Sequence, residues 1–192
     1  METKETVIYK PAHTPNQKWV KDLDPRQMDS TLSSFIAPKN DKRVITLCRP
    51  FVVIPKTSYS SPVTLPIGLA YVGAVLDKAG YNTKIIDATG DQKSVKIRRS
   101  KNNLYNLQGL TPEEIVDKID PNTFIFGISL MFSSEWFAHR SLIEDIKKKY
   151  PNIIIVAGGE HSTAIPEHIL KNCPSIDYVI RGEGEFSMLE FA

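Results

Sequence analysis

The sequence predicts an α/β domain built on a parallel β-sheet. Five short apolar runs, rich in β-branched residues, alternate with segments whose apolar residues recur at helical spacing. The runs are continuously apolar, which is typical of strands covered on both faces, and such strands form parallel sheets with right-handed crossovers. We expect strands that start near Val44, Thr83, Thr123, Ile153 and Tyr178.

Each segment between these runs carries the signals of a helix. The first helix is expected to stop at Gly80, and the second opens with Thr111, Pro112 and Glu114 in capping-box order. The third is expected to begin with Ser133 or Ser134 as its cap residue, and the fourth covers "IPEHILKNC". The residues expected to face inward are Leu69, Val72, Leu76, Ala79, Ile115, Ile119, Trp136, Ile143, Ile146, Tyr150, Ile165, Ile169 and Cys173.

This alternation predicts a doubly wound, flavodoxin-like (Rossmann-like) domain with a five-stranded parallel sheet in the order 2-1-3-4-5. In such a sheet the ligand binds at the carboxyl ends of the strands, where strands 1 and 3 diverge. Function is therefore expected in the four loops that follow strands 1, 3, 4 and 5. These loops cover residues 49–66, 129–134, 158–163 and 181–185.

Residues 1–42 read as an irregular N-terminal arm in front of the domain at 43–192. Four prolines stand among polar residues there, with few apolar positions in any regular period. We expect the arm to pack little, with Trp19 and Phe35 in simple packing contacts.

Composition indicates a globular protein with a real core. Hydrophobic residues make up 41% of the chain, and no stretch approaches the roughly 20 apolar residues of a membrane span. The N-terminus lacks the apolar core of a secretion signal, so a cytoplasmic location is expected. Cys48 and Cys173 lie far apart and are expected to be buried free thiols. The net charge of +2 does not decide for or against a nucleic-acid surface.

Several familiar chemistries lack their residues. The ends of strands 1 and 3 read Cys48-Arg49 and Ser129, without the carboxylates of a phosphoacceptor domain. No glycine-rich turn joins strand 1 directly to its helix, and no P-loop lysine motif occurs. No strand-turn-helix elbow presents a serine as nucleophile. We therefore expect neither a catalytic residue nor a metal ligand from this chain.

Three motifs in order, "GISLMFSSEW", "VAGGEHSTAIPEHIL" and "DYVIRGEGE", resemble the N-terminal cobalamin-binding domain of cobalamin-dependent radical SAM enzymes. The resemblance extends through "LPIGLAYVGAVLDKAGY" and "GLTPEEIVDKI" and so covers most of residues 43–192. Cobalamin domains of the methionine synthase and mutase kind carry Ser-x-Leu after strand 3 and Gly-Gly after strand 4, separated by a gap in the mid-to-high twenties. Here 26 residues separate Ser129-Leu130-Met131 from Gly158, and the methionine is a departure from leucine at the third position.

The resemblance implies a site for the nucleotide tail of cobalamin. Gly158 and Gly159 would let the tail approach the backbone, where a side chain would fill the slot, and Ser129 would supply a hydroxyl. The other interpretation of the glycine pair is a tight turn into the helix. Glu183 and Glu185 would contact corrin amides or only cap the last helix. The implied cofactor-binding residues are Ser129, Leu130, Met131, Ser133, Gly158, Gly159, Glu160, His161, Gly182, Glu183 and Gly184.

The loop after strand 1 reads "CRPFVVIPK" and contains no histidine, whereas methionine synthase and mutase domains place Asp-x-His-x-x-Gly there. We therefore expect cobalamin without a protein histidine on cobalt. His161 is the nearest alternative ligand, against a polar contact to the tail or a hydrogen bond at the helix start. His161 and His168 are too far apart in sequence, with Pro166 between them, for a zinc pair, and His13 and His139 carry no signal.

The family resemblance implies that cobalamin serves methyl transfer or radical chemistry in a methyltransferase or cyclase. A radical SAM domain, in cis or in trans, would bind an iron–sulfur cluster that cleaves S-adenosylmethionine. This chain contains no Cys-x-x-x-Cys-x-x-Cys, so we expect that domain to be missing from it and the isolated chain to be inactive.

The alternative function is a cofactor-free scaffold, or a module that docks substrate or RNA for a radical SAM protein. The insertion "DQKSVKIRRSKNN" would then grip a polyanion. Few aromatic residues interleave its basic residues, so a solvated loop is the better interpretation and nucleic acid is not the favoured partner. The basic residues concerned are Lys93, Lys96, Arg98, Arg99 and Lys101.

Overall fold

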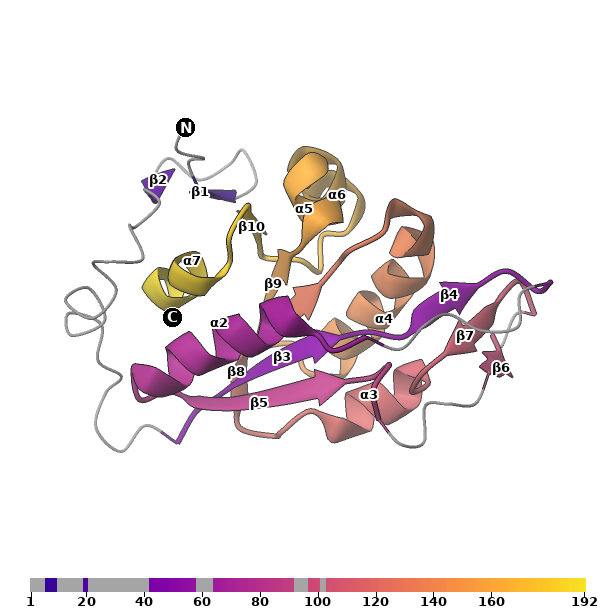
Figure 1. The fold of residues 1–192 in the computed structure, drawn as a ribbon, viewed down its shortest axis with the longest axis horizontal. Helices are drawn as coiled ribbons and strands as arrows, with labels where there is room; N and C mark the ends of the chain where they lie inside the picture. The colour runs from indigo at the N-terminus through magenta and orange to yellow at the C-terminus, as the bar shows by residue number, and fades with distance from the viewer. Residues whose placement is uncertain (1–5, 10–18, 21–41, 58–63, 92–96, 101–102) are drawn as a thin grey trace.

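The computed structural model describes residues 6–9, 19–20, 42–57, 64–91, 97–100 and 103–192. Helices cover both faces of a central β-sheet, and a second, smaller sheet extends beyond the carboxyl ends of β3 and β5 (Figure 1). The chain therefore has the three-layer α/β architecture that its alternating pattern predicts.

Five parallel strands form the centre of the large sheet, and their spatial order confirms the predicted 2-1-3-4-5. Along the sheet the order is β5-β3-β8-β9-β10, and every neighbouring pair is parallel. Each strand starts within one residue of the predicted position. The strands are β3 (Val44–Arg49), β5 (Asn82–Asp87), β8 (Thr123–Ser129), β9 (Ile154–Gly158) and β10 (Tyr178–Arg181).

Two further strands lie at the β10 edge of this sheet. β1 (Thr6–Tyr9) pairs antiparallel with β10, and β2 (Trp19–Val20) pairs antiparallel with β1. The N-terminal segment that we expected to be an irregular arm thus contributes two short strands, because the exposed edge of a sheet offers unpaired backbone groups to another segment. The rest of that segment, with Phe35, lies outside the described residues.

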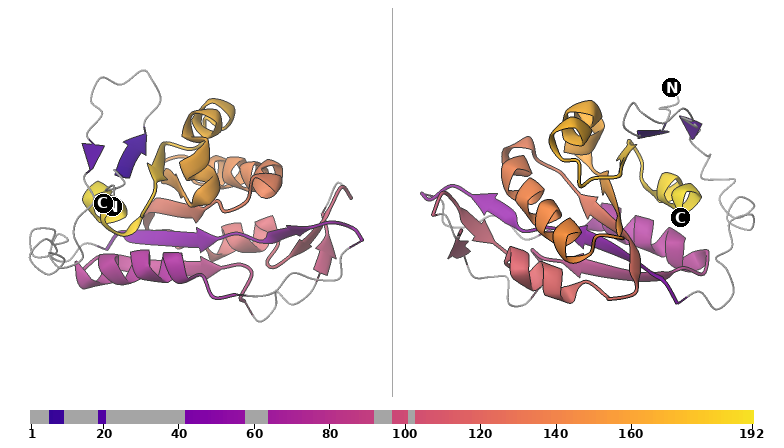
Figure 2. Two further views of the ribbon diagram at one scale, coloured as in Figure 1. Left: turned by 45° about the horizontal axis from the view of Figure 1, so that its top comes forward. Right: turned by 180° about the vertical axis from the view of Figure 1, so that it is seen from behind.

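The helices divide between the two faces of the sheet (Figure 2). One face carries α2 (Ile67–Lys78) and α7 (Glu185–Phe191). The other carries α3 (Pro112–Lys118), α4 (Trp136–Lys149) and α6 (Pro166–Asn172). The short helix α5 (Glu160–Ala164) follows β9 directly, and the 3-10 turn η3 (Ser133–Glu135) leads into α4.

The helix signals are confirmed in two places and wrong in one. Thr111 and Glu114 form the predicted capping box at the start of α3. Gly80 follows α2 with a φ of +89°, as expected of a glycine after a helix end. Neither Ser133 nor Ser134 caps α4, because the chain enters that helix through η3 and no side chain makes a capping hydrogen bond at its start.

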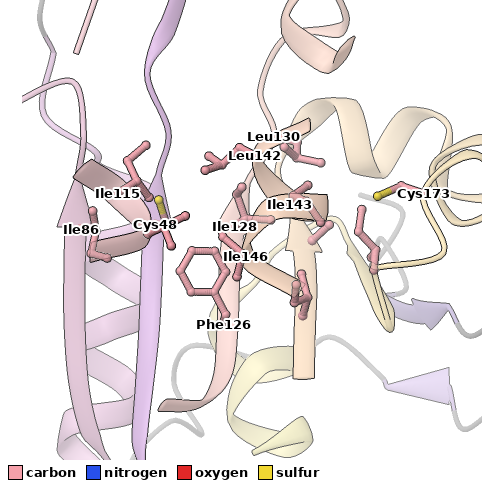
Figure 3. Packing of buried hydrophobic residues seen from close by; sticks show 14 of the residues in the cluster. Cys48, Ile86, Ile115, Phe126, Ile128, Leu130, Leu142, Ile143, Ile146 and Cys173 are labelled. Carbon is pink, nitrogen blue, oxygen red and sulfur yellow. The ribbon is translucent and has the colours of Figure 1, made fainter. Parts of the chain in front are cut away.

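The face under α3, α4 and α6 is packed with apolar side chains from strands and helices (Figure 3). Phe126 and Ile128 of β8 meet Ile143 and Ile146 of α4 there. Cys48 and Cys173 were expected to be buried free thiols, and both are buried and free in this cluster. Burial, and secondarily the charge of Asp87, strongly raises the pKa of the Cys48 thiol, so it is not a reactive thiolate.

The smaller sheet was not predicted from the sequence. β4 (Val52–Ile54) and β6 (Ile97–Arg99) flank β7 (Asn106–Gln108), and both pairings are antiparallel. We expected only loops at residues 49–66 and in the insertion after the second strand of the parallel sheet. Three-residue strands are too short to show a period of two, so their pairing depends on contacts far apart in sequence.

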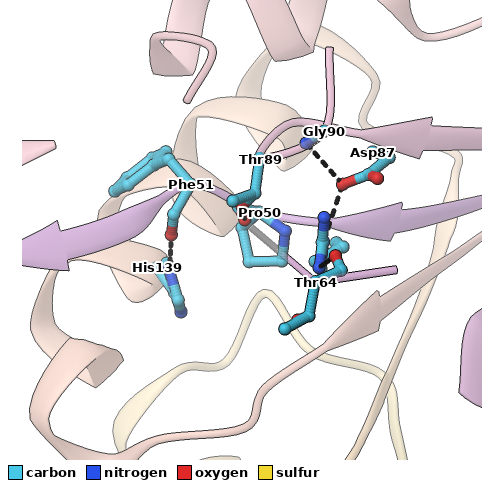
Figure 4. A network of polar contacts seen from close by, with 8 residues as sticks. Pro50, Phe51, Thr64, Asp87, Thr89, Gly90 and His139 are labelled. Carbon is cyan, nitrogen blue, oxygen red and sulfur yellow. Dashed lines mark hydrogen bonds and ion pairs between the residues drawn. The ribbon is translucent and has the colours of Figure 1, made fainter. Parts of the chain in front are cut away.

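Two buried side chains, one from η3 and one from α4, bond to the chain that follows β3. Glu135 Oε1 accepts a hydrogen bond from the Val53 amide at 3.0 Å. His139 Nε2 donates to the Phe51 carbonyl at 2.8 Å (Figure 4), and the two rings meet edge to face. Burial raises the pKa of Glu135. His139 carried no signal in the sequence, yet it is a buried anchor of this loop.

No helix among the described residues is long and apolar enough to cross a lipid bilayer.

The buried His139 makes the stability of the fold depend on pH. Burial, against a smaller opposing effect of its hydrogen bond, lowers its pKa from 6.5 to about 4. The unfolded chain therefore takes up this proton at higher pH than the folded chain. Between about pH 7 and pH 5 the free energy of unfolding should fall by about 2 kcal/mol on account of this residue, measured by urea denaturation.

The matched variant is His139→Gln, whose side-chain amide can still donate to the Phe51 carbonyl but does not titrate. Its free energy of unfolding should lose less over the same pH interval than that of the wild type. Equal losses in the two proteins would contradict the assigned role of His139.

Candidate functional site

A cavity of about 650 Å³ opens at the carboxyl ends of the strands. Its walls come from β3, β8, β9 and β10 on one side and from α2 and α7 on the other. This volume lies within the range of small-molecule sites. The position agrees with the expectation that a doubly wound sheet binds its ligand at this edge.

Eight of the eleven residues expected to bind a cofactor line this cavity. They come from the loops after β8, β9 and β10, which the parallel sheet brings to one edge. Leu130, Ser133 and His161 do not line it. The eight are Ser129, Met131, Gly158, Gly159, Glu160, Gly182, Glu183 and Gly184.

Ser129 and Gly158 stand opposite each other at the ends of β8 and β9. A Cβ atom added to Gly158 would find no other atom within 4 Å. Packing within the protein therefore does not require glycine at this position. The missing side chain of Gly158 instead leaves open space beside the cavity. The Ser129 hydroxyl makes no hydrogen bond with any residue that the structure describes, so it is available to a ligand.

Gly159 is glycine for a different reason. Its φ is +96°, and an added Cβ would lie 2.6 Å from the Leu130 carbonyl oxygen. That carbonyl accepts the His161 amide at 3.1 Å, while the Leu130 amide donates to the Gly158 carbonyl at 2.8 Å. The two glycines were expected to clear one slot together. The structure separates them: Gly158 leaves space, whereas Gly159 makes the turn that ties the loop after β8 to α5.

His161 and Ser133 meet outside the cavity. The Ser133 Oγ and the His161 Nδ1 lie 2.8 Å apart, and the imidazole packs against the ring of Trp136 at 5.4 Å between centroids. The His161 Nε2 is buried and has no hydrogen-bond partner within the described part of the chain. Burial, and then the nearby His168, lowers the pKa of His161. The structure thus pairs this imidazole with Ser133 and brings neither into the lining.

The rim of the cavity carries three carboxylates, those of Glu160, Glu183 and Glu185, and the guanidinium of Arg181. Arg181 Nε donates to the Thr163 carbonyl at 3.3 Å. Neither Glu183 nor Glu185 caps α7 through its side chain, since Gly184 stands at that position without a side-chain capping bond. The carboxylates of Glu183 and Glu185 therefore do not cap α7, which was one of the two expectations for these residues.

The deep wall of the cavity was not identified from the sequence. Leu47, Gly127 and Val156 line it from three neighbouring strands, and Met188 lines it from α7. The strands are apolar throughout, so the sequence does not distinguish side chains under a packed helix from side chains under a cavity. Leu69 and Val72 of α2, which also line it, were expected only as core residues.

Two other classes of site can be checked on the same residues. Among the described residues, no three His, Cys, Asp or Glu side chains are placed to hold a metal ion. In the basic insertion, Arg98 Nη1 pairs with Glu114 Oε2 at 2.6 Å and is therefore not free for a polyanion. Lys93, Lys96 and Lys101 lie outside the described residues.

Comparison with known proteins identifies a family. The model of the B12 binding domain matches residues 59–192. An uncharacterized methyltransferase from Pyrococcus horikoshii is 31% identical over 65% of this chain and 23% of its own length. An anaerobic magnesium-protoporphyrin IX monomethyl ester cyclase from Synechocystis is 31% identical over 62% of this chain and 21% of its own length.

The name of a third relative mentions both cobalamin and radical SAM chemistry. The cobalamin-dependent radical SAM methyltransferase TokK from Streptomyces tokunonensis is 38% identical over 45 residues, 23% of this chain and 7% of its own length. The chain spans less than a quarter of the length of each of these three relatives.

The different roles of the two glycines predict different effects on stability. Gly159→Ala should lower the free energy of unfolding by about 1–3 kcal/mol, because alanine is strained at this φ and its methyl group meets the Leu130 carbonyl. Gly158→Ala should change it by less than about 0.5 kcal/mol, because its methyl group enters open space. Urea denaturation of both variants measures this, and equal losses would contradict the distinction.

Proposed function

The chain belongs to the B12-binding domain family, and we propose that it binds a cobalamin-type corrinoid in the cavity between α2, α7 and the sheet. The observation that carries the proposal is Gly158, whose missing side chain opens onto the cavity at the strand end opposite Ser129. A long nucleotide tail needs such an unobstructed slot beside the backbone.

The lining fits the chemistry of such a ligand. The Ser129 hydroxyl is free to bond to the tail, and the carboxylates of Glu160 and Glu183 can accept hydrogen bonds from the amide side chains of a corrin. Met131 and Phe132, on the loop after β8, are 42% and 61% exposed and offer apolar surface near the mouth. Apolar surface with a few placed polar groups is the usual make-up of a cofactor site.

We propose further that cobalt receives no imidazole from this protein. Residues 49–66 contain no histidine. The loop after β3 is already committed to other contacts, because Thr89 Oγ1 donates to the Pro50 carbonyl and His139 to the Phe51 carbonyl. His161 is engaged with Ser133 outside the lining. When bound, the cobalt of a corrinoid supplies methyl-transfer or radical chemistry.

The chain's own residues bind and orient the corrinoid, and none of them is assigned a proton-transfer or nucleophilic role. The relatives named above are methyltransferases and a cyclase, and one is a cobalamin-dependent radical SAM enzyme. We therefore propose that this domain presents its corrinoid to a radical SAM domain, in cis or in trans. S-adenosylmethionine and the iron–sulfur cluster would be bound by that other domain.

Binding tests the proposal directly. The purified chain should retain hydroxocobalamin through gel filtration, detected by its visible absorbance. Gly158→Val should abolish retention, since its methyl groups fill the slot. The control Ala164→Val introduces the same valine side chain at an exposed position of α5 outside the lining and should bind normally.

Circular dichroism must show that each variant is folded. A folded wild-type chain that fails to retain hydroxocobalamin would overturn the proposal and favour a cofactor-free docking module.

The absence of a protein imidazole on cobalt has a spectroscopic consequence. The electron paramagnetic resonance spectrum of bound Co(II) cobalamin should lack nitrogen splitting, because under this proposal the tail would lie in the cavity and no histidine would take its place. His161→Ala should leave that spectrum unchanged. Nitrogen splitting that disappears in His161→Ala would instead make His161 the ligand.

A further inference from the structure

We infer that His161 is a positioning residue of the corrinoid site. Its side chain does not line the cavity, but it holds the loop after β8, and with it Ser129 and Met131, in the conformation that receives a ligand. The inference rests on the proposed function, because this loop forms part of the cavity in which we place the corrinoid.

Two anchors join the loop after β8 to α5, and both end on His161. The His161 amide donates to the Leu130 carbonyl at 3.1 Å, and the His161 Nδ1 lies 2.8 Å from the Ser133 Oγ. Met131 and Phe132 stand between these two anchors. The part of the loop that reaches the mouth of the cavity is therefore held on both sides by one residue.

This part of the loop gains little from packing. Met131 and Phe132 are both exposed, and neither belongs to the two buried clusters among the described residues. A segment with few buried apolar contacts opens easily unless hydrogen bonds hold it. The second anchor stands at Ser133, where the loop passes into η3. The bond between Ser133 and His161 therefore has a large share in fixing the loop.

The surroundings of His161 show which property of histidine is used. The residue is 3% exposed, and its ring packs against Trp136. A phenyl ring of similar shape would pack there without burying ring nitrogens, so packing does not by itself favour histidine. What phenylalanine lacks is a group that can bond to the Ser133 hydroxyl. That bond is the role assigned to the imidazole.

Loss of the bond should weaken binding without touching the ligand. A loop that leaves its binding conformation for part of the time reduces the apparent affinity by the fraction that remains competent. One net hydrogen bond is worth about 0.5–1.5 kcal/mol, which corresponds to an affinity about 2- to 13-fold lower.

Two substitutions of His161 separate the bond from the packing. His161→Phe keeps the ring and loses the bond, whereas His161→Asn offers an amide to Ser133 and loses the ring. The affinity for hydroxocobalamin, measured by equilibrium dialysis, should fall about 2- to 13-fold in His161→Phe. In His161→Asn it should stay within about twofold of the wild type, because the bond is kept.

Stability should follow the opposite order. In urea denaturation His161→Asn should be the less stable of the two variants, because it loses the ring contact with Trp136. A merely structural histidine would instead make the affinity follow the stability.

The partner side of the bond gives an independent test. Ser133→Ala should weaken binding as much as His161→Phe does, and the double variant should bind no more weakly than either single one, because both remove the same bond. The matched control Ser134→Ala changes the neighbouring exposed serine outside the lining and should bind normally.

Hydrogen exchange tests the cause in the ligand-free chain. Amides of residues 129–135 should exchange faster in His161→Phe and in Ser133→Ala than in the wild type and in His161→Asn. Equal exchange in all four proteins would overturn the inference, because the bond would then not hold the loop.

The outcomes separate this inference from the proposed function. A folded wild-type chain that does not bind hydroxocobalamin overturns both. A wild type that binds, together with a His161→Phe variant that binds equally well, overturns only the inference. Weaker binding by His161→Asn than by His161→Phe also overturns it. If His161→Phe does not fold, Ser133→Ala and its control decide the question, because Ser133 is exposed.

Discussion

The ladder between β8 and β9 is the constraint on which the site depends. Its register places Ser129 opposite Gly158, and one residue further the Leu130 backbone continues the pairing beyond the strand ends. The Leu130 amide and carbonyl bond to Gly158 and His161, so the loops after two strands are joined by their backbones. Ser129 and Gly158, 29 positions apart in the sequence, thereby become neighbours at one edge of the sheet.

Charge-assisted contacts attach the wall of the cavity to the same edge. Arg49, the last residue of β3, pairs through Nε with Asp87 Oδ1 at 2.6 Å, and its Nη1 donates to the Thr64 carbonyl just before α2. Asp87 also accepts the Gly90 amide. Hydrogen bonds between charged groups are stronger than those between neutral ones. The start of α2, one wall of the cavity, is thus tied to the ends of β3 and β5.

The two faces of the sheet serve different purposes. Under α3, α4 and α6 the apolar side chains form one large packed cluster. Buried Glu135 and His139 bond from this face to Val53 of the smaller sheet and to the neighbouring Phe51 carbonyl. Under α2 and α7 the packing is interrupted by the cavity, where Gly158 contributes no side chain and leaves open space. The first face thus carries the larger packed cluster, while the second opens into the cavity.

The sequence by itself determined the five parallel strands, their order, the capping box of α3 and eight lining residues. These follow from local signals: continuous apolar runs, cap residues, and polar or glycine residues at strand ends, which a parallel sheet gathers at one edge. Only the tertiary structure decided the smaller sheet, the strands in the N-terminal segment, and the pairing of His161 with Ser133. It also separated the space left by Gly158 from the turn made by Gly159, and revealed Leu47, Gly127, Val156 and Met188 as the deep wall. Those features depend on contacts between residues far apart in the chain, and no local pattern specifies which side chain will meet which partner.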